Sequence, residues 1–99
     1  MKLLSDAEIT QALSSLPGWT REGQAIVKQV NCATFADAVA AFVKLAFDAE
    51  AADHHPDVTI SYRRLRVSFT THSEGGVTVK DIDGARAAEW TLAAVAVVS

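Results

Sequence analysis

The central stretch of the chain reads Val58-Thr59-Ile60-Ser61-Tyr62-Arg63-Arg64-Leu65-Arg66-Val67-Ser68-Phe69. Apolar and polar side chains alternate on both sides of Arg63-Arg64, and this period of two is typical of strands that bury one face. Two strands joined by so short a turn run antiparallel. The stretch therefore predicts a β-hairpin with its turn at Arg63-Arg64.

The segment before this hairpin predicts a long helix. Thr34 and Asp37 fit an N-terminal cap pair, and large apolar residues follow at helical spacing, so we expect them to face the core. This stripe consists of Phe35, Val39, Phe42, Val43, Ala46 and Phe47. Because Pro56 disfavours helical geometry at the residue before it, the helix should end by about Asp53 or His54.

The start of the chain predicts a short helix followed by another hairpin. Ser5 and Glu8 fit a capping box, in which each side chain binds the backbone amide of the other residue. Pro17-Gly18 should stop this helix. Two strands are then expected, at residues 19–21 and 24–30, on either side of a glycine turn.

The end of the chain completes the predicted architecture. Thr78 and Asp81 form a third cap pair, opening a helix that runs to about Val97. The element order is α-β-β-α-β-β-α, and hairpins without βαβ units favour an antiparallel sheet. We therefore expect an α+β fold, a four-stranded antiparallel sheet with three helices packed on one face. Residues 1–99 should form a single domain.

Composition excludes several classes of protein. The net charge is −3 with no run of like charges, which argues against nucleic acid as a partner. The longest apolar run, residues 92–98, falls short of the ~20 residues that a membrane span needs. The single cysteine, Cys32, cannot form an internal disulfide, and no signal segment is apparent. We expect a cytoplasmic protein with neither nucleic acid nor membrane as a partner.

The histidines are the main candidates for chemistry. All three of them, His54, His55 and His72, fall within 19 residues, and the hairpin between them can return His72 to the helix exit. Imidazole has an unperturbed pKa of ~6.5 and so transfers protons near neutral pH with little tuning. The alternative is an ordinary polar loop at a helix C-terminus, where a cation is favoured.

Three neighbouring residues each allow two interpretations. Glu50 continues the apolar stripe, so it is either half hidden, where it could orient an imidazole, or solvated at the frayed helix end. Asp81 stabilises a capped helix whether or not it has a further role. Trp19 is explained by core packing or by walling a flat heterocycle.

A metal site is a rival interpretation of the histidines, because three imidazoles resemble the ligands of catalytic zinc. The spacing argues against it. Adjacent histidines in an extended segment tend to point apart, and no His-x-His or His-x-x-x-His pattern is present. We therefore expect no bound metal. Cys32 has no motif of an activated nucleophile either.

The residues around the histidines resemble a known family. EAADHHPDV at residues 50–58, followed by Tyr62, THSEGGVT at 71–78 and Asp81, closely resembles the pterin-4a-carbinolamine dehydratase family. The resemblance covers nearly the whole chain, including LPGW at 16–19. It implies a four-stranded antiparallel sheet with three helices on one side, in agreement with the order derived above.

The resemblance implies dehydration of 4a-hydroxytetrahydropterin to quinonoid dihydropterin, without cofactor or metal. It places the three histidines in the active site, and we assign His54 and His72 to acid–base catalysis and His55 to binding and orientation. The reaction needs a proton donor for the leaving hydroxide and a base for the N5 proton, which two imidazoles can supply. Around them the resemblance implies a substrate-binding or supporting set of Glu50, Pro56, Trp19 and Asp81.

The resemblance also implies partners. These are the pterin substrate, an aromatic amino-acid hydroxylase in the same cycle, and further copies of the chain in a homodimer or homotetramer. The last helix and an edge strand would serve assembly, although Gly84, Trp90 and the apolar 92–98 run depart from the family pattern and leave the oligomeric state open. A non-catalytic assembly or dimerisation module on the same fold is the main alternative function. A small metal-dependent hydrolase or metal carrier is the other.

Overall fold

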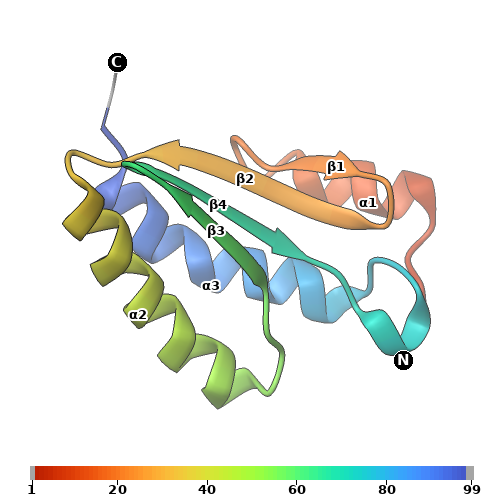
Figure 1. The fold of residues 1–99 in the computed structure, drawn as a ribbon. Coiled ribbons are helices and arrows are strands. Elements are labelled where there is room, and N and C mark those ends of the chain that lie inside the picture. Colours follow the sequence, from red (N-terminus) through yellow and green to blue (C-terminus); the bar gives the residue numbers. More distant parts are fainter. Residues whose placement is uncertain (1, 98–99) are drawn as a thin grey trace.

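The computed structural model describes residues 2–97 and shows four antiparallel strands with three α-helices on one face of the sheet (Figure 1). In chain order the elements are α1 (Asp6–Leu13), β1 (Thr20–Glu22), β2 (Ala25–Asn31), α2 (Phe35–Ala52), β3 (Asp57–Ser61), β4 (Arg64–Phe69), the 3-10 helix η1 (His72–Glu74) and α3 (Val79–Val95). The predicted α+β fold and the order α-β-β-α-β-β-α are confirmed.

Local capping explains where the helices begin. The Ser5 hydroxyl accepts the Glu8 amide at 3.1 Å, and the Glu8 carboxylate accepts the Ser5 amide at 2.8 Å. The bond from the Ser5 amide to the charged carboxylate lowers the pKa of the Glu8 carboxyl. At the start of α2, the Thr34 hydroxyl accepts the Asp37 amide at 3.0 Å. Each cap satisfies an amide that the first helical turn leaves without a partner.

The sheet has the order β1-β2-β4-β3, so β4 lies in its interior and β3 at one edge. Ile26 on β2 pairs with Phe69 on β4, and Val30 pairs with Leu65. These four side chains are buried on the face that the helices cover. The period of two in the sequence therefore separates the core face of the sheet from its polar face.

The turn of the central hairpin lies at Tyr62-Arg63, one residue earlier than predicted. Ser61 and Arg64 form the last pair of the ladder, and Tyr62 takes a φ of +54°. Two-residue hairpin turns favour positive φ because their twist matches that of the strands. Alternation missed this position because Tyr62 continues the apolar register, although its side chain is 86% exposed.

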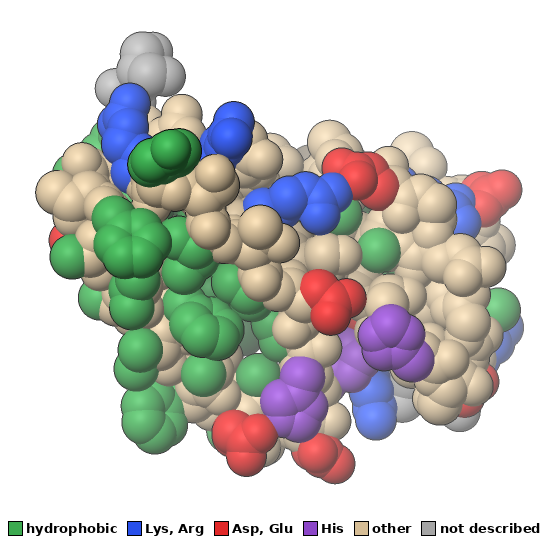
Figure 2. All heavy atoms as spheres, in the orientation of Figure 1, with side chains coloured by type: hydrophobic (Ala, Val, Ile, Leu, Met, Phe, Trp, Pro, Cys, Tyr) green, Lys and Arg blue, Asp and Glu red, His purple; other side chains and the backbone are tan. Residues whose placement is uncertain are grey.

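The face of α2 that packs on the core is not the predicted one. Most of the large apolar stripe lies on the surface, and Phe35, Phe42 and Phe47 are 59%, 40% and 70% exposed. We call five exposed residues the α2 apolar face: Phe35, Val39, Phe42, Val43 and Phe47. They form much of the hydrophobic surface in Figure 2, over the position of α2 in Figure 1. The buried stripe is instead Ala38, Ala41, Leu45 and Ala49.

Both stripes of α2 satisfy a helical period, so periodicity alone cannot choose between them. Alanines allow α2 to approach the sheet and α3 closely, because their side chains are small, and close-packed interiors favour such contact. The larger residues are left outside. The prediction was wrong because it weighted side-chain size and ignored how near the neighbouring elements come.

A partly buried ion pair ties α3 to the sheet. The Lys28 ammonium donates to Glu89 at 2.5 Å and to the Pro17 carbonyl at 3.0 Å, and the Trp19 indole N–H donates to the same Glu89 oxygen at 2.9 Å. Gly18, with a φ of +85°, lets the Lys28 side chain pass, since a Cβ there would lie 2.9 Å from Lys28 Cε. The cluster connects β2, α3 and the loop before β1.

The last helix ends at Val95, about two residues earlier than predicted. Beyond it the Val97 amide donates to the Asn31 carbonyl at 2.8 Å, so pairing with β2 replaces the final helical bonds. Leu92 is fully buried, and Val98, the end of the apolar run, lies outside the described residues. Within residues 2–97, no helix has the length and apolar character to cross a membrane.

Candidate active site

The exit of α2 delivers the first histidine. Asp53 takes a left-handed conformation (φ 51°, ψ 41°), and its amide bonds the Glu50 carbonyl at 3.2 Å. The next amide, of His54, bonds the Ala49 carbonyl at 3.1 Å. These bonds satisfy carbonyls that the last turn leaves free and reverse the chain direction. His54 therefore leaves the helix in a defined orientation before Pro56 leads into β3.

His54 contacts a carboxylate on α3. Its Nε2 lies 2.6 Å from Asp81 Oδ1, and the Asp81 side chain is fully buried. The other carboxylate oxygen, Oδ2, accepts the Thr78 amide and the Thr71 hydroxyl, both at 2.8 Å. Asp81 thus caps α3, as its sequence position predicts, and also binds the histidine with its second oxygen.

The hydrogen-bond network defines which nitrogen of His54 carries the proton. The Lys80 amide donates to Thr78 Oγ1 at 3.2 Å. The Thr71 hydroxyl uses its hydrogen in the bond to Asp81, so in the 2.8 Å contact between the two threonines Thr78 is the donor and Thr71 the acceptor. These donors end at Oδ2, and because a carboxylate oxygen only accepts hydrogen bonds, we assign the donor at Oδ1 to Nε2–H of His54. In the neutral imidazole the lone pair is then at Nδ1.

An aromatic ring fixes the plane of the same imidazole. Phe69, the last residue of β4, stacks with His54 at a centroid distance of 6.0 Å and an interplanar angle of 17°. The His54 side chain is 13% exposed, so one part of the ring still reaches the surface. A face contact with Phe69 and an edge contact with Asp81 together hold this side chain.

His55 has a carboxylate partner of its own. Its Nε2 lies 2.6 Å from Glu50 Oε1. The Glu50 side chain is 76% exposed, so it is not half hidden. The reason is that the stripe of α2 that it continues lies on the surface. It nevertheless meets an imidazole, which was one of its two expected roles. This pair is solvated, whereas the His54–Asp81 pair is not.

His72 begins the 3-10 helix η1 and is exposed. The residue before it, Thr71, is buried and binds Asp81, so the same carboxylate anchors the loop that carries His72. The three histidines line one surface depression, which we call the histidine cleft, and Figure 2 shows them gathered on one part of the surface. The cleft is lined by Asp53, His54, His55, Thr70, Thr71, His72, Ser73 and Lys80.

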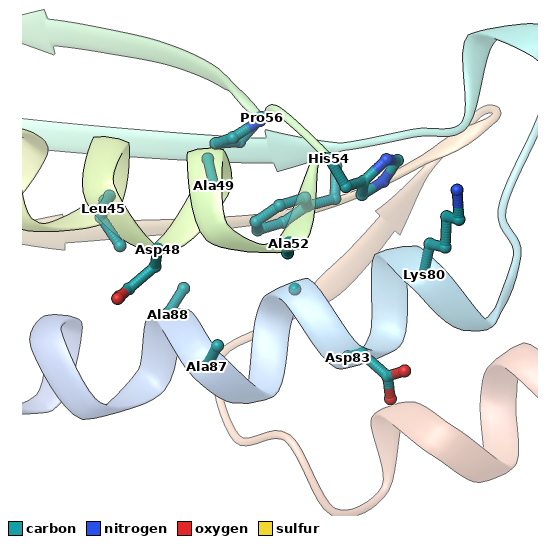
Figure 3. A pocket seen from close by; sticks show the side chains of 12 residues that line it. Leu45, Asp48, Ala49, Ala52, His54, Pro56, Lys80, Asp83, Ala87 and Ala88 are labelled. Carbon is teal, nitrogen blue, oxygen red and sulfur yellow. The ribbon is translucent and has the colours of Figure 1, made fainter.

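A second hollow, the interhelical pocket, lies between α2 and α3 on the other side of His54 (Figure 3). It is largely apolar, with a cavity volume of about 160 Å³, and its lining includes Pro56, Phe69 and Gly84. His54 and Lys80 line both hollows. Pro56 therefore faces this pocket, although the sequence grouped it with the histidines.

The remaining candidate, Trp19, lies in the core. It is 4% exposed and packs against Phe69 at a centroid distance of 6.0 Å, and it lines neither hollow. Sequence reasoning missed Phe69, Thr71 and Lys80. Phe69 carried only a strand signal, Thr71 appeared only inside the family string, and nothing marked Lys80.

No group of three or more His, Cys, Asp and Glu side chains in residues 2–97 is placed to hold a metal ion. Each of the two adjacent histidines uses Nε2 on a carboxylate from a different helix. The arrangement thus presents three imidazoles, one on a buried carboxylate and two nearer to solvent.

Comparison with known proteins assigns the fold to a family. The family model described as pterin 4 alpha carbinolamine dehydratase matches residues 2–90. The chain belongs to the pterin-4-alpha-carbinolamine dehydratase family. The match includes the helix exit, both strands of the central hairpin and the start of α3, so it covers every residue of the histidine cleft.

Individual members of this dehydratase family are similar over most of their length. A relative from Roseiflexus sp. (strain RS-1), named provisionally as a pterin-4-alpha-carbinolamine dehydratase, is 51% identical over 80 residues, which are 81% of this chain and 86% of the relative. A relative from Mycobacteroides abscessus with the same name is 46% identical over 83% of this chain and 87% of its own.

A solved structure of a family member has the same fold. The crystal structure of a transcriptional coactivator/pterin dehydratase from Brucella melitensis superposes with a TM-score of 0.88 at 34% identity. It covers 92% of this chain and 99% of the other. The resemblance read from the histidine motif is therefore confirmed at the level of family and fold.

Proposed function

We propose that this protein converts a 4a-hydroxytetrahydropterin to quinonoid dihydropterin and water, with His54 and His72 as the proton-transfer groups. The observation that carries the proposal is the buried Asp81 carboxylate bound to His54 beside two further histidines. Family membership supports the pterin substrate and the dehydration. No cofactor or metal takes part in the proposed reaction.

The elimination needs one acid and one base. The C4a–O bond breaks, the hydroxyl leaves as water after gaining a proton, and loss of the N5 proton allows a C4a=N5 double bond to form. His54 is the base, because its Nδ1 lone pair is free to accept while Asp81 stabilises the imidazolium that results. His72 is the acid and regains its proton from solvent, to which it is exposed.

His55 has the supporting role. Its contact with the solvated Glu50 holds one imidazole nitrogen and leaves the other for a polar group of the pterin. Each proton transfer is typically worth ~10² to 10⁴ in rate, so a histidine pair can account for a moderate acceleration of a reaction that also proceeds without enzyme.

The direct test compares dehydration rates with and without the protein. A hydroxylase generates the 4a-hydroxytetrahydropterin, this protein is added after chelator treatment and removal of the chelator, and quinonoid dihydropterin is followed by absorbance. Acceleration by the chelator-treated protein is the expected result. A folded sample that gives no acceleration contradicts the dehydratase, and acceleration that disappears with the chelator and returns with a metal contradicts the metal-free mechanism.

The proposed place of this reaction is pterin recycling. The substrate is the product of an aromatic amino-acid hydroxylase, so such an enzyme is the proposed functional partner. In an assay that also contains a reductant able to return quinonoid dihydropterin to tetrahydropterin, adding this protein should raise the steady rate of the hydroxylase when pterin is limiting. An unchanged rate under that condition would contradict the recycling role while leaving the dehydration itself intact.

We also propose that the chain assembles with further copies of itself through the α2 apolar face. Five large uncharged side chains line one side of a helix, a pattern that marks association surfaces in soluble proteins. Two copies related by a twofold axis would place Phe35 of each near Phe47 of the other, which makes the face complementary to itself. One such contact gives a homodimer, and a homotetramer would need a second, different contact surface.

Sedimentation analysis of Phe42→Glu tests this assembly. The variant should lower the molecular mass in solution. Trp90→Glu, at an 86% exposed residue on α3, tests the alternative that the last helix carries the contact, and it should leave the mass unchanged. A wild-type chain that sediments as a monomer contradicts the proposal. If Phe42→Glu abolishes assembly but leaves dehydration intact, a non-catalytic assembly role is separable from the dehydratase activity. Two observations favour this second function: the α2 apolar face and the coactivator name of the Brucella protein.

A further inference from the structure

Gly84 lies in the interior of α3, where glycine weakens a helix. A Cβ at this position would lie 2.6 Å from Phe69 Cε1 and 2.9 Å from both Cδ1 and Cζ. Contacts under 3.0 Å do not occur for real Cβ atoms. The missing side chain of Gly84 is therefore the space that the Phe69 ring occupies.

The Phe69 ring cannot shift freely to make room for a side chain. It is 4% exposed, and Trp19 packs against it at a centroid distance of 6.0 Å. Trp19 is fixed in turn by its hydrogen bond to Glu89, which also binds Lys28. A ring pushed from α3 can move into the interhelical pocket, which Phe69 and Gly84 both line, or towards the His54 imidazole, and either movement changes its stacking with His54.

We propose that Gly84 is a positioning residue for His54, acting through Phe69. With no side chain at Gly84, the Phe69 ring lies 17° from parallel to the imidazole and holds Nε2 at 2.6 Å from Asp81. A methyl group at residue 84 displaces the ring, turns the imidazole and lengthens the bond to the carboxylate. We call this transmission of a steric contact from residue 84 through Phe69 to His54 the steric relay. The loss of catalysis that it predicts rests on the proposed function, whereas the relay itself does not.

The relay also gives Trp19 a role. This residue lines neither the histidine cleft nor the interhelical pocket, yet its ring packs against Phe69, which stacks in turn with His54. Gly84, Phe69 and Trp19 come from α3, β4 and the loop before β1, so three separate segments determine the plane of one imidazole.

Gly84→Ala tests the relay by two independent readouts. Nitrogen NMR of the His54 ring should show displaced Nε2 and Nδ1 signals, because the Asp81 contact changes. Turnover should fall about tenfold, with kcat affected more than KM, because the base is misplaced while the cleft remains open. Wild-type ring signals in a folded Gly84→Ala protein would overturn the proposal.

A double variant separates the relay from a general loss of stability. In Phe69→Leu the shorter side chain leaves space near residue 84, so adding Gly84→Ala should cause little further change in ring signals or kcat. Effects that add fully in Gly84→Ala/Phe69→Leu would overturn the relay. Should Gly84→Ala not fold, Phe69→Leu alone decides, since unchanged His54 signals without the stacking ring contradict the proposal.

The two proposals fail in different ways. If the wild-type protein does not accelerate dehydration, the function is wrong, but the NMR signals of His54 still report on the relay. If dehydration occurs and Gly84→Ala leaves both the ring signals and kcat unchanged, only the positioning role is wrong.

Discussion

His54 Nε2 and Asp81 Oδ1 lie 2.6 Å apart, although their residues are 27 positions apart in the chain. Asp81 is fully buried and uses its second oxygen to cap α3 and to bind Thr71. A single carboxylate thus stabilises a helix start, the loop before His72 and the orientation of His54. Within residues 2–97, no buried side-chain nitrogen or oxygen lacks a hydrogen-bond partner, so this network is complete.

Asp81→Asn should impair activity more than stability. The substitution replaces one acceptor oxygen by an amide NH₂ donor. If this donor faces His54, Nε2 must accept from it, so the ring proton moves to Nδ1. Nδ1 then has no lone pair with which to act as the base. We expect turnover to fall at least ~10²-fold and the free energy of unfolding to fall by about 1–3 kcal/mol. Turnover assays and urea denaturation measure the two effects.

The matched control is Asp83→Asn, on the same helix but exposed. Exposed substitutions of this kind change stability by no more than about 0.5 kcal/mol. Equal effects of the two variants on turnover would show that the buried carboxylate has no special role.

Loss of single histidines should separate proton transfer from binding. His54→Ala and His72→Ala should each lower turnover at least ~10-fold, whereas His55→Ala should mainly raise KM. His54→Gln keeps a donor for Asp81, so it should lose activity with less loss of stability than His54→Ala. Steady-state kinetics and circular dichroism give these quantities. Unchanged turnover in both His54→Ala and His72→Ala contradicts the assignment.

Glu89→Ala should destabilise the fold. It leaves the Lys28 ammonium, whose side chain is 14% exposed, with only the Pro17 carbonyl, and it removes the partner of the Trp19 indole. We expect a loss of about 2–4 kcal/mol in urea denaturation. Glu22→Gln, which breaks the more exposed pair with Arg66, should cost less than about 1 kcal/mol. Similar losses in both variants would refute a special role for the buried pair.

Cys32 should be unreactive in the folded protein. Its side chain is buried, and burial raises the pKa of the thiol above its ordinary value of 9.0. Because the thiolate is the reactive form, alkylation at pH 8 should be at least ~10-fold slower than in urea, as mass spectrometry can follow. The same shift stabilises the fold below the ordinary thiol pKa, and this contribution is lost as the pH rises through the raised value. Equal alkylation rates in the two states would show that the thiol is accessible.

Much of the fold was predictable because its signals are local. Cap pairs such as Ser5 with Glu8 lie within one helical turn, and the alternation through Leu65 and Val67 follows from the pleat of a single strand. The gathering of the histidines was predictable for the same reason, since a hairpin returns the chain to its starting end. These features gave the element order and the position of the candidate site.

The sequence by itself therefore determined the elements, the hairpins and the gathering of the three histidines. Only the tertiary structure decided which side of α2 packs inward, because two stripes share one period and the choice depends on how closely Ala41 and Leu45 approach other elements. It also decided that Asp81 meets His54 and that Phe69 fills the space at Gly84. Those contacts depend on how a helix lies across a sheet, and no short-range pattern in the chain encodes that distance.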